Sequence, residues 1–211
     1  MRSFDTASNF ARLKNKTQTP LERHTVLSTK SLKEAKGFTY HVWAKHKSHV
    51  RGTGKYSPTI TRAPLGQSPL CFVDCRAPMH VEAAGNATKA TLYYPLSGWM
   101  KNSAAGTRLM AVPRGPTFIP ARTRITFDAA RIRCVLLEIS TVALRAEIAA
   151  CGGQTANIPP LAWKPSAPSA KSISEVIGFA LAQIDSRETS SRNTAYTRRL
   201  EGLLLSTLAN S

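Results

Sequence analysis

The segment Arg131–Gly153 constrains the fold more than any other part of the chain, because it predicts two kinds of secondary structure in direct succession. Ile132–Ile139 consists mainly of β-branched and long aliphatic residues and has Glu138 as its only acid, a pattern typical of a buried strand. Ser140 can cap a helix over Thr141–Cys151, and the two glycines that follow can end it. The segments before this unit predict short strands, and those after it predict helices.

Between Pro58 and Phe127 the chain is divided into short apolar segments separated by Gly, Pro and Asn. The expected strands are Leu70–Cys75, Met79–Glu82, Ala90–Leu96, Thr107–Val112, Thr117–Ile119 and Arg124–Phe127. Short strands at close spacing indicate a β-barrel or sandwich rather than alternating strands and helices. Pro95 is expected at an edge or a turn, because proline cannot donate to a central ladder. We therefore expect a small jelly-roll-like barrel.

Helices are predicted on both sides of this barrel in the sequence. Apolar residues recur at helical spacing from Leu32 to Trp43, with Ser31 as a possible cap. Nearer the C-terminus, Ser172–Glu175 forms a capping box ahead of an apolar stripe, and Thr194–Ala209 predicts a second amphipathic helix. The expected fold class is α+β: a cupin-like barrel preceded by one helix and followed by a strand-to-helix unit and two antiparallel helices.

The chain of 211 residues carries a formal net charge of +17, which favours polyanionic partners such as nucleic acid. The excess is concentrated early, since residues 1–64 contain 13 basic and three acidic residues. The sequence contains no stretch long enough for a transmembrane helix and no apolar signal segment at its start. Four cysteines in a chain of this length do not make a disulfide framework, so we expect a cytoplasmic protein.

Six segments occur in an order and spacing that match a known family. They are Ser28–Gly52, Leu70–Ala84, Leu92–Lys101, Val112–Pro120, Leu136–Gly153 and Arg198–Leu208. Together they resemble the N-terminal regulatory domain of AraC/XylS-type bacterial transcription regulators, in its cupin-like, AraC-binding-like form. The resemblance implies a β-barrel that senses a small molecule and antiparallel helices that dimerise.

The resemblance ends where the chain ends. Members of this family continue past the last helix into two helix-turn-helix units, whereas this chain stops at Ser211. The resemblance therefore implies an effector-sensing and dimerisation domain, truncated or free-standing, that binds DNA only weakly and non-specifically. We expect residues 1–27 to be a disordered basic leader, 28–153 the helix and barrel, and 154–211 a linker and helical dimerisation subdomain.

An aromatic group in the predicted barrel is the candidate ligand site, because small-molecule pockets are mostly apolar with a few polar groups. Its members are Tyr93, Tyr94, Trp99 and Phe118. The alternative is that these four side chains are ordinary barrel core.

A leucine stripe on the last helix is the candidate dimerisation surface. Its members are Leu200, Leu203, Leu204, Leu205 and Leu208. The stripe is wider than one neighbouring helix should cover, so pairing about a two-fold axis would bury it on both copies. In this interpretation Leu205 lies at the interface and Leu204 faces inward. The alternative is that the barrel alone covers the stripe.

Metal and catalytic signals are weak. His41, His46 and His49 precede the barrel, and the predicted barrel strands hold only His80, whereas a cupin metal site needs several ligands on the strands. No Gly-x-Ser-x-Gly motif or paired carboxylates are present. We therefore expect no metal, no other cofactor and no enzymatic activity.

Three hypotheses follow. The first is the sensor and dimerisation domain of an AraC-type regulator, with a small-molecule effector and no membrane partner. The second is a basic protein that binds nucleic acid non-specifically through its charge. The third, least favoured, is a cupin-type metalloenzyme.

Overall fold

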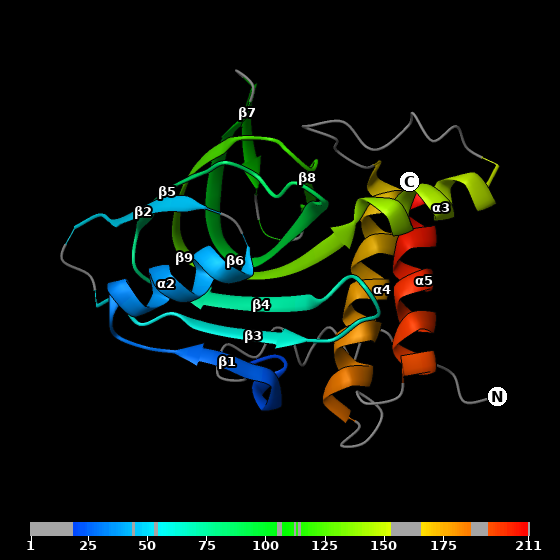
Figure 1. Cartoon of the computed structure of the whole chain (residues 1–211), viewed down its shortest axis with the longest axis horizontal. Coiled ribbons are helices and arrows are strands. Elements are labelled where there is room, and N and C mark those ends of the chain that lie inside the picture. Colours follow the sequence, from blue (N-terminus) through cyan, green and yellow to red (C-terminus); the bar gives the residue numbers. More distant parts are fainter. Residues whose placement is uncertain are drawn as a thin grey trace.

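The computed structural model describes residues 19–43, 45–52, 55–104, 107–111, 113, 115–152, 166–186 and 194–210. Within these ranges a curled antiparallel sheet of nine strands has helices α3, α4 and α5 on one side and α2 on the other (Figure 1). The strands are β1 (Thr25–Ser28), β2 (His46–Val50), β3 (Thr59–Ala63), β4 (Leu70–Cys75), β5 (Met79–Ala83), β6 (Lys89–Ala104), β7 (Thr107–Ala111), β8 (Thr117–Ile119) and β9 (Ile125–Ser140). The helices are η1 (Glu22–His24), α2 (Leu32–Val42), α3 (Thr141–Ala150), α4 (Ala167–Ser186) and α5 (Thr194–Ala209). This arrangement confirms the expected α+β, cupin-like fold class.

Strand β9 organises the sheet. Its first half pairs with β5 and its second half with β4, while β6 pairs with it on the other side along almost its whole length. From β4 the sheet continues through β3 to β1, and from β5 to β2. β7 and β8 pair with the outer side of β6. Two long central strands thus bring short segments from distant parts of the sequence into one curved surface.

Strand β6 is longer than the predicted Ala90–Leu96, because it continues past Leu96 to Ala104. Its register against β9 shifts between Pro95 and Ser97 and again between Ser97 and Trp99. Gly98 has φ +80 there, and an added Cβ would lie 2.3 Å from the carbonyl oxygen of Arg131. Pro95 is therefore inside a central strand rather than at an edge, but the ladder is interrupted at that point by bulges, where a missing N–H is tolerated.

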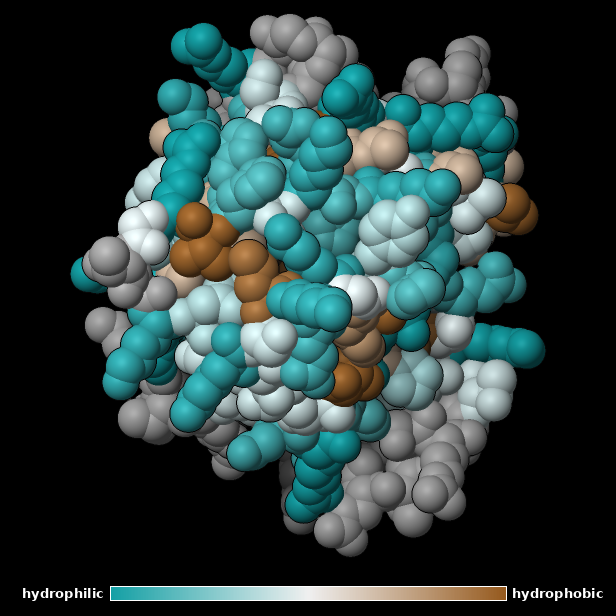
Figure 2. Space-filling model, turned by 60° about the vertical axis from the view of Figure 1, so that its left-hand side comes forward, coloured by the Kyte–Doolittle hydropathy of each residue, from teal (hydrophilic) through white to brown (hydrophobic). Residues whose placement is uncertain are grey.

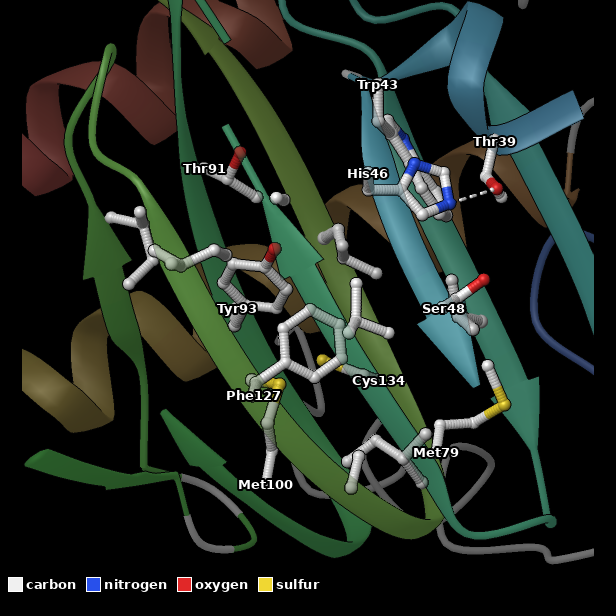
Figure 3. A pocket seen from close by; sticks show the side chains of 18 of the residues that line it. Thr39, Trp43, His46, Ser48, Met79, Thr91, Tyr93, Met100, Phe127 and Cys134 are labelled. Atoms are coloured by element: carbon white, nitrogen blue, oxygen red, sulfur yellow. Dashed lines mark hydrogen bonds between the residues drawn. The ribbon is translucent and has the colours of Figure 1, made fainter. Parts of the chain in front are cut away.

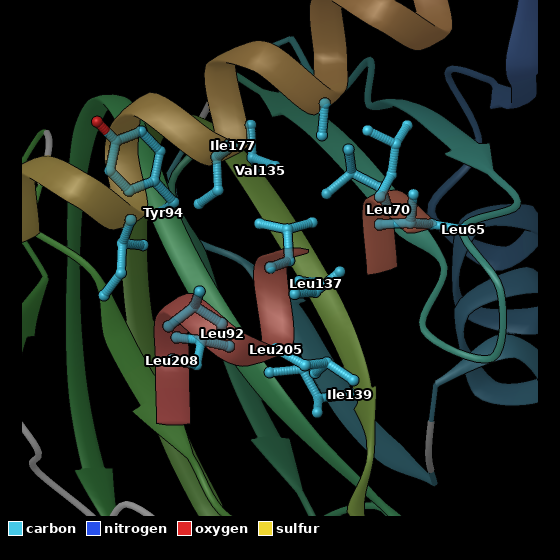
Figure 4. Packing of buried hydrophobic residues seen from close by; sticks show 14 of the residues in the cluster. Leu65, Leu70, Leu92, Tyr94, Val135, Leu137, Ile139, Ile177, Leu205 and Leu208 are labelled. Carbon is cyan, nitrogen blue, oxygen red and sulfur yellow. The ribbon is translucent and has the colours of Figure 1, made fainter. Parts of the chain in front are cut away.

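The two faces of the central strands are both buried, against different surroundings. On β9, Leu137 and Ile139 pack with α4 and α5, as Figure 4 shows. Their neighbours Leu136 and Glu138 point to the opposite face, toward the inside of the curled sheet. Alternating side chains on a strand point to opposite faces, so the apolar run predicted over this region is confirmed as a strand covered on both sides.

The helix starts follow local capping in most cases. The Ser31 and Ser140 hydroxyls accept hydrogen bonds from the first turns of α2 and α3, as expected. α4 differs, because it begins at Ala167 and not at the predicted capping box. Ser166 accepts a bond from the main-chain N–H of Ser169 at 3.3 Å and caps the helix there, so Ser172 lies inside it. An earlier cap and a proline in the first turn, where no N–H is needed, extend the helix.

Residues 20–27, expected in a disordered leader, form part of the fold. Leu21 is fully buried in the cluster on the helical side, and its main-chain N–H donates to Asp185 on α4 at 2.9 Å. The Thr61 hydroxyl donates to the carbonyl oxygen of Pro20 at 3.2 Å. β1 then pairs with β3. The described part of the fold therefore begins before the predicted boundary, and residues 1–18 of the leader lie outside the described residues.

Candidate functional site

A cavity of about 190 Å³ lies inside the curl of the sheet, on the face opposite α4 and α5. Strands β2 to β6, β8 and β9 line it, and α2 covers one side (Figure 3). Its size exceeds an engineered protein cavity of about 150 Å³ that stays dry and binds benzene. The space is therefore sufficient for a molecule with about one ring.

Most of the cavity wall is apolar. These side chains alternate with those that pack under the helices, so they belong to the inner face of the same strands. The main apolar lining residues are Ile60, Val73, Val81, Met79, Met100, Ile125, Phe127 and Leu136. Such a wall favours an apolar body in any molecule that occupies the cavity.

One strand contributes a row of polar groups. Lys89, Thr91 and Tyr93 are alternate residues of β6 and all line the cavity. Positions two apart on a strand lie about 6.8 Å apart, so the row extends along one wall. Burial raises the pKa of Tyr93 above its ordinary value, with smaller contributions from Cys134 and Glu138. The phenol is therefore neutral, and no described residue hydrogen-bonds its hydroxyl.

A buried carboxylate lies at the Lys89 end of the row. Glu138 is 3% exposed and accepts hydrogen bonds from Lys89 Nζ at 2.9 Å, Trp43 Nε1 at 2.9 Å and Arg62 Nη2 at 3.3 Å. Burial alone would raise the pKa of Glu138, but the bonds from Arg62 and Lys89 outweigh it and the pKa lies below its ordinary value. The carboxylate is ionised and its acceptor positions are occupied.

The opposite wall comes from α2 and β2. Thr39 of α2 and the ring of His46 lie 2.9 Å apart and are hydrogen-bonded, with Ser48 further along β2 (Figure 3). Asn86 donates to the main-chain carbonyl of Trp43 at 2.9 Å and holds the end of α2 near the sheet. The cover over the cavity is thus fixed to the barrel by several polar contacts.

Two cysteine thiols also face the cavity. Burial raises the pKa of Cys75 to about 11 and that of Cys134 to about 12. A third thiol, Cys71, is 3.4 Å from Glu138, and burial raises its pKa as well. These thiols are protonated at neutral pH and contribute weakly polar surface rather than thiolate.

The structure separates the four aromatic residues of the predicted ligand site. Tyr93 lines the cavity, but Tyr94 and Phe118 are fully buried on the helical side, where the Tyr94 hydroxyl donates to Ser174 at 2.8 Å. Trp99 follows the bulge of β6 and is 44% exposed. Strand alternation directs Tyr93 and Tyr94 to opposite faces.

The cavity also contains groups that the sequence interpretation did not select. Glu138, Lys89 and Trp43 come from β9, β6 and the end of α2, and they meet only in the folded chain. One signal was available for Glu138, because a lone acid in a buried apolar strand requires a charged partner. Nothing local indicated which cations would supply it.

The structure places most of the predicted dimerisation leucines inside the chain. Leu200, Leu204, Leu205 and Leu208 are buried in the cluster formed by α3, α4, α5 and the helical face of the sheet. Leu203 is 44% exposed. The sheet, α3 and α4 together cover a wider arc of α5 than one neighbouring helix would. These four leucines are therefore buried within the chain, as in the alternative interpretation, but by two helices as well as by the barrel.

The histidines His46 and His80 lie in different places and have different partners. His80 Nδ1 lies 2.8 Å from an Asp128 oxygen and 3.1 Å from Arg51 Nη2, on the outer side of β5. His46 lines the cavity beside Thr39. Within the described ranges, no three His, Cys, Asp or Glu side chains are grouped as metal ligands would be.

Known proteins resemble this chain in fold, but no sequence family matches it. No family model and no curated protein sequence matches the chain. The AraC-like transcriptional activator CuxR has a similar structure, with a TM-score of 0.64 and 12% identity over 87% of this chain and 69% of the activator. The resemblance to an AraC-type regulatory domain is thereby confirmed at the level of the fold.

Smaller barrels match only part of the chain. The nucleoside dehydratase Pac13 of Streptomyces has a TM-score of 0.32 and 17% identity over 46% of this chain and 83% of its own. KdgF from a Halomonas species has a TM-score of 0.32 and 12% identity over 44% of this chain and 87% of its own.

One expectation from the sequence is corrected by these matches. The chain was expected not to be an enzyme, yet a nucleoside dehydratase is among the proteins that match its barrel. The barrel by itself does not exclude catalysis, and that exclusion is withdrawn.

In the described part of the chain, none of the helices has the length and apolar character needed to cross a bilayer.

Proposed function

We propose that this chain is the effector-sensing domain of an AraC-type transcription regulator and binds a small molecule in the barrel cavity. The observation that carries the proposal is the cavity of about 190 Å³, lined by β2 to β6, β8 and β9 and covered by α2. The fold shared with an AraC-like activator supports the regulatory role. The four free cysteines suit a reducing compartment, so the proposal includes a cytoplasmic location.

A ligand bound in the cavity would shift the helices through the central strands, because these strands contact both. Tyr93 faces the cavity while Tyr94, the next residue, bonds to Ser174 of α4. Leu136 and Leu137 of β9 divide in the same way between the cavity and the helical cluster. A ligand that moves either strand therefore moves residues under α4 and α5, because packed cores deform in discrete steps rather than continuously.

A cavity-filling variant tests the proposal. Ala129 is 4% exposed and lines the cavity on β9, so Ala129→Leu should fill part of it. A panel of small organic compounds would be screened by thermal denaturation of the intact chain. A compound at about ten times its Kd stabilises by about 1.4 kcal/mol, or about 3–5 °C for a chain of this size.

The same screen with Ala130→Leu provides the control, because Ala130 is the next residue of β9 and points to the other face. Compounds that stabilise the parent and Ala130→Leu but not Ala129→Leu support a ligand in the cavity. If no compound stabilises the parent, or if both variants respond as the parent does, the cavity is not the binding site.

Dimerisation is a second part of the proposal and involves a smaller surface than the leucine stripe suggested. Leu203 is the member of the stripe with substantial exposure, at 44%, and it lies on the outward side of α5. A self-association surface on this helix would therefore centre on Leu203 rather than on its buried neighbours. Isologous pairing would bury it on both copies.

Non-specific nucleic-acid binding is a second candidate function, favoured by the net charge of +17. Binding of this kind releases counterions, so it should be independent of DNA sequence and fall steeply as salt rises. Gel-shift or anisotropy measurements at about 50 and 200 mM salt test it. Sequence-selective binding at the higher salt would contradict the sensor-only proposal and support a direct role on DNA.

A further inference from the structure

Several polar groups that line the cavity have donor capacity left over for a ligand. Lys89 donates a hydrogen bond to Glu138 at 2.9 Å, and an ammonium has three donors. The Tyr93 hydroxyl and the Thr91 hydroxyl, on the same face of β6, have no bonding partner among the described residues. The one carboxylate in the wall, Glu138, already receives bonds from three side chains. The two hydroxyls can donate or accept, but the Lys89 ammonium can only donate, so a ligand group beside it must be an acceptor.

The fixed charges around the cavity have a positive excess. Glu138 is the single acid of the lining, and it is paired with both Arg62 and Lys89. Lys36 of α2 adds another cation to the wall. A positively charged ligand would face two lysines with no free carboxylate, whereas an anionic group would gain a charge-assisted bond from Lys89 in a region of low dielectric.

The surface around α2 extends this positive character outward. Residues 30–50, which include α2 and β2, contain five lysines and one glutamate. Figure 2 shows the side of the molecule that carries these elements as mostly hydrophilic, with a band of hydrophobic groups across its middle. Clustered charge of one sign beside a cavity raises the local concentration of oppositely charged ligands and their association rate.

We infer that the ligand of this cavity is a small organic acid, with an apolar body of about one ring and a single carboxylate or similar anionic group. The apolar body packs against residues such as Phe127 and Val81, and the anion accepts bonds from Lys89 and the Tyr93 hydroxyl. The inference rests on the proposed sensor function and specifies its ligand class.

Three probes of the same shape test the charge requirement. Benzoate, benzamide and benzylamine differ in carrying a negative, a neutral and a positive group at neutral pH, and their binding to the intact chain can be measured by calorimetry or ligand-observed NMR. A charge-assisted bond makes benzoate bind about tenfold or more tighter than benzamide. Benzylamine should bind least.

Two lysine variants locate the effect. Lys89→Met keeps the stem and removes the ammonium, so benzoate should bind about tenfold more weakly while benzamide changes less than about twofold. Lys47→Met is the matched control, because Lys47 lies on the exposed side of β2 and the variant loses the same charge. Benzoate binding to this control should stay within about twofold of the parent.

Each outcome decides between the two proposals. If benzamide matches benzoate, or Lys47→Met weakens benzoate as much as Lys89→Met does, the anion inference is overturned and the sensor cavity stands. If Lys89→Met does not fold, Tyr93→Phe replaces it and should weaken benzoate several-fold. If benzoate does not bind while the compound screen yields hits sensitive to Ala129→Leu, the anion inference alone fails. No binding in either experiment overturns both.

Discussion

The buried carboxylate of Glu138 provides the sharpest test of how the cavity wall is held together. Glu138→Gln keeps the size of the side chain but removes its charge. One carboxylate oxygen accepts from Trp43 and Arg62, and the other accepts from Arg62 and Lys89. A glutamine must present its NH₂ group to one of these sets, so a donor replaces an acceptor beside a cation.

The magnitude follows from the bonds lost and from their exposure. A hydrogen bond to a charged group contributes about 1.5–3 kcal/mol, and at least one such bond is lost. The side chains of Arg62 and Lys89 are 33% and 27% exposed, so water compensates part of the loss. We expect a decrease of about 2 kcal/mol in the free energy of unfolding, or about 4–8 °C in Tm for a chain of this length.

The effect should depend on pH in a defined direction. The pKa of Glu138 lies below its ordinary value of 4.5 in the folded chain, so the ionised group stabilises the fold above that pH. This contribution is lost as pH falls through the folded pKa. The difference between parent and Glu138→Gln should therefore be constant between about pH 6 and 8 and shrink progressively below about pH 4.5.

Urea unfolding at several pH values, followed by circular dichroism, measures both quantities. Glu82→Gln is the control, because the Glu82 side chain is 42% exposed and lies 3.6 Å from the His80 ring. That variant should stay within about 0.5 kcal/mol of the parent. Equal stability of Glu138→Gln and the parent at pH 7 would refute the account of the buried ion cluster.

Two further pairs of variants test the packing around α5, both by urea unfolding at pH 7. Gly66→Ala should destabilise by at least about 1 kcal/mol, because Gly66 has φ +57 and the added Cβ would lie 1.7 Å from a Glu201 oxygen. Gly202→Ala, in open space on α5, should instead stabilise by about 0.5–1 kcal/mol. Leu205→Glu should destabilise by several kcal/mol, since it buries an unpaired carboxylate. Leu203→Glu should leave unfolding unchanged and, if a dimer forms through α5, yield a monomer in sedimentation.

Local patterns predicted the elements whose stability is local. The helix α2 after Ser31, the helix α3 after Ser140 and the amphipathic α5 all follow from caps and apolar spacing within a few residues. The apolar run ending at Ile139 predicted a buried strand for the same reason. These features needed no information about distant parts of the chain.

Local patterns did not predict the full length of the long strands or the first residue of α4. Pro95 and Gly98 interrupt the sequence signal of β6, but pairing with β9 carries the strand past them through two register shifts. The capping box at Ser172 is a valid local start, yet Ser166 provides an earlier one. Where two local solutions compete, long-range pairing or a neighbouring cap decides between them.

The sequence by itself determined the class of the protein: a β-barrel with flanking helices, a positive charge excess and a regulator-like order of segments. Only the tertiary structure decided which face of each strand meets the cavity and which meets the helices. Strand alternation predicts that Tyr93 and Tyr94 point to opposite faces of the sheet, but it does not predict which of them faces the cavity. The contact of Glu138 with Lys89 and Trp43 likewise spans 49 and 95 residues of sequence. The Glu138 cluster exists only once the sheet has closed, because Glu138, Lys89 and Trp43 come from three separate segments of the chain.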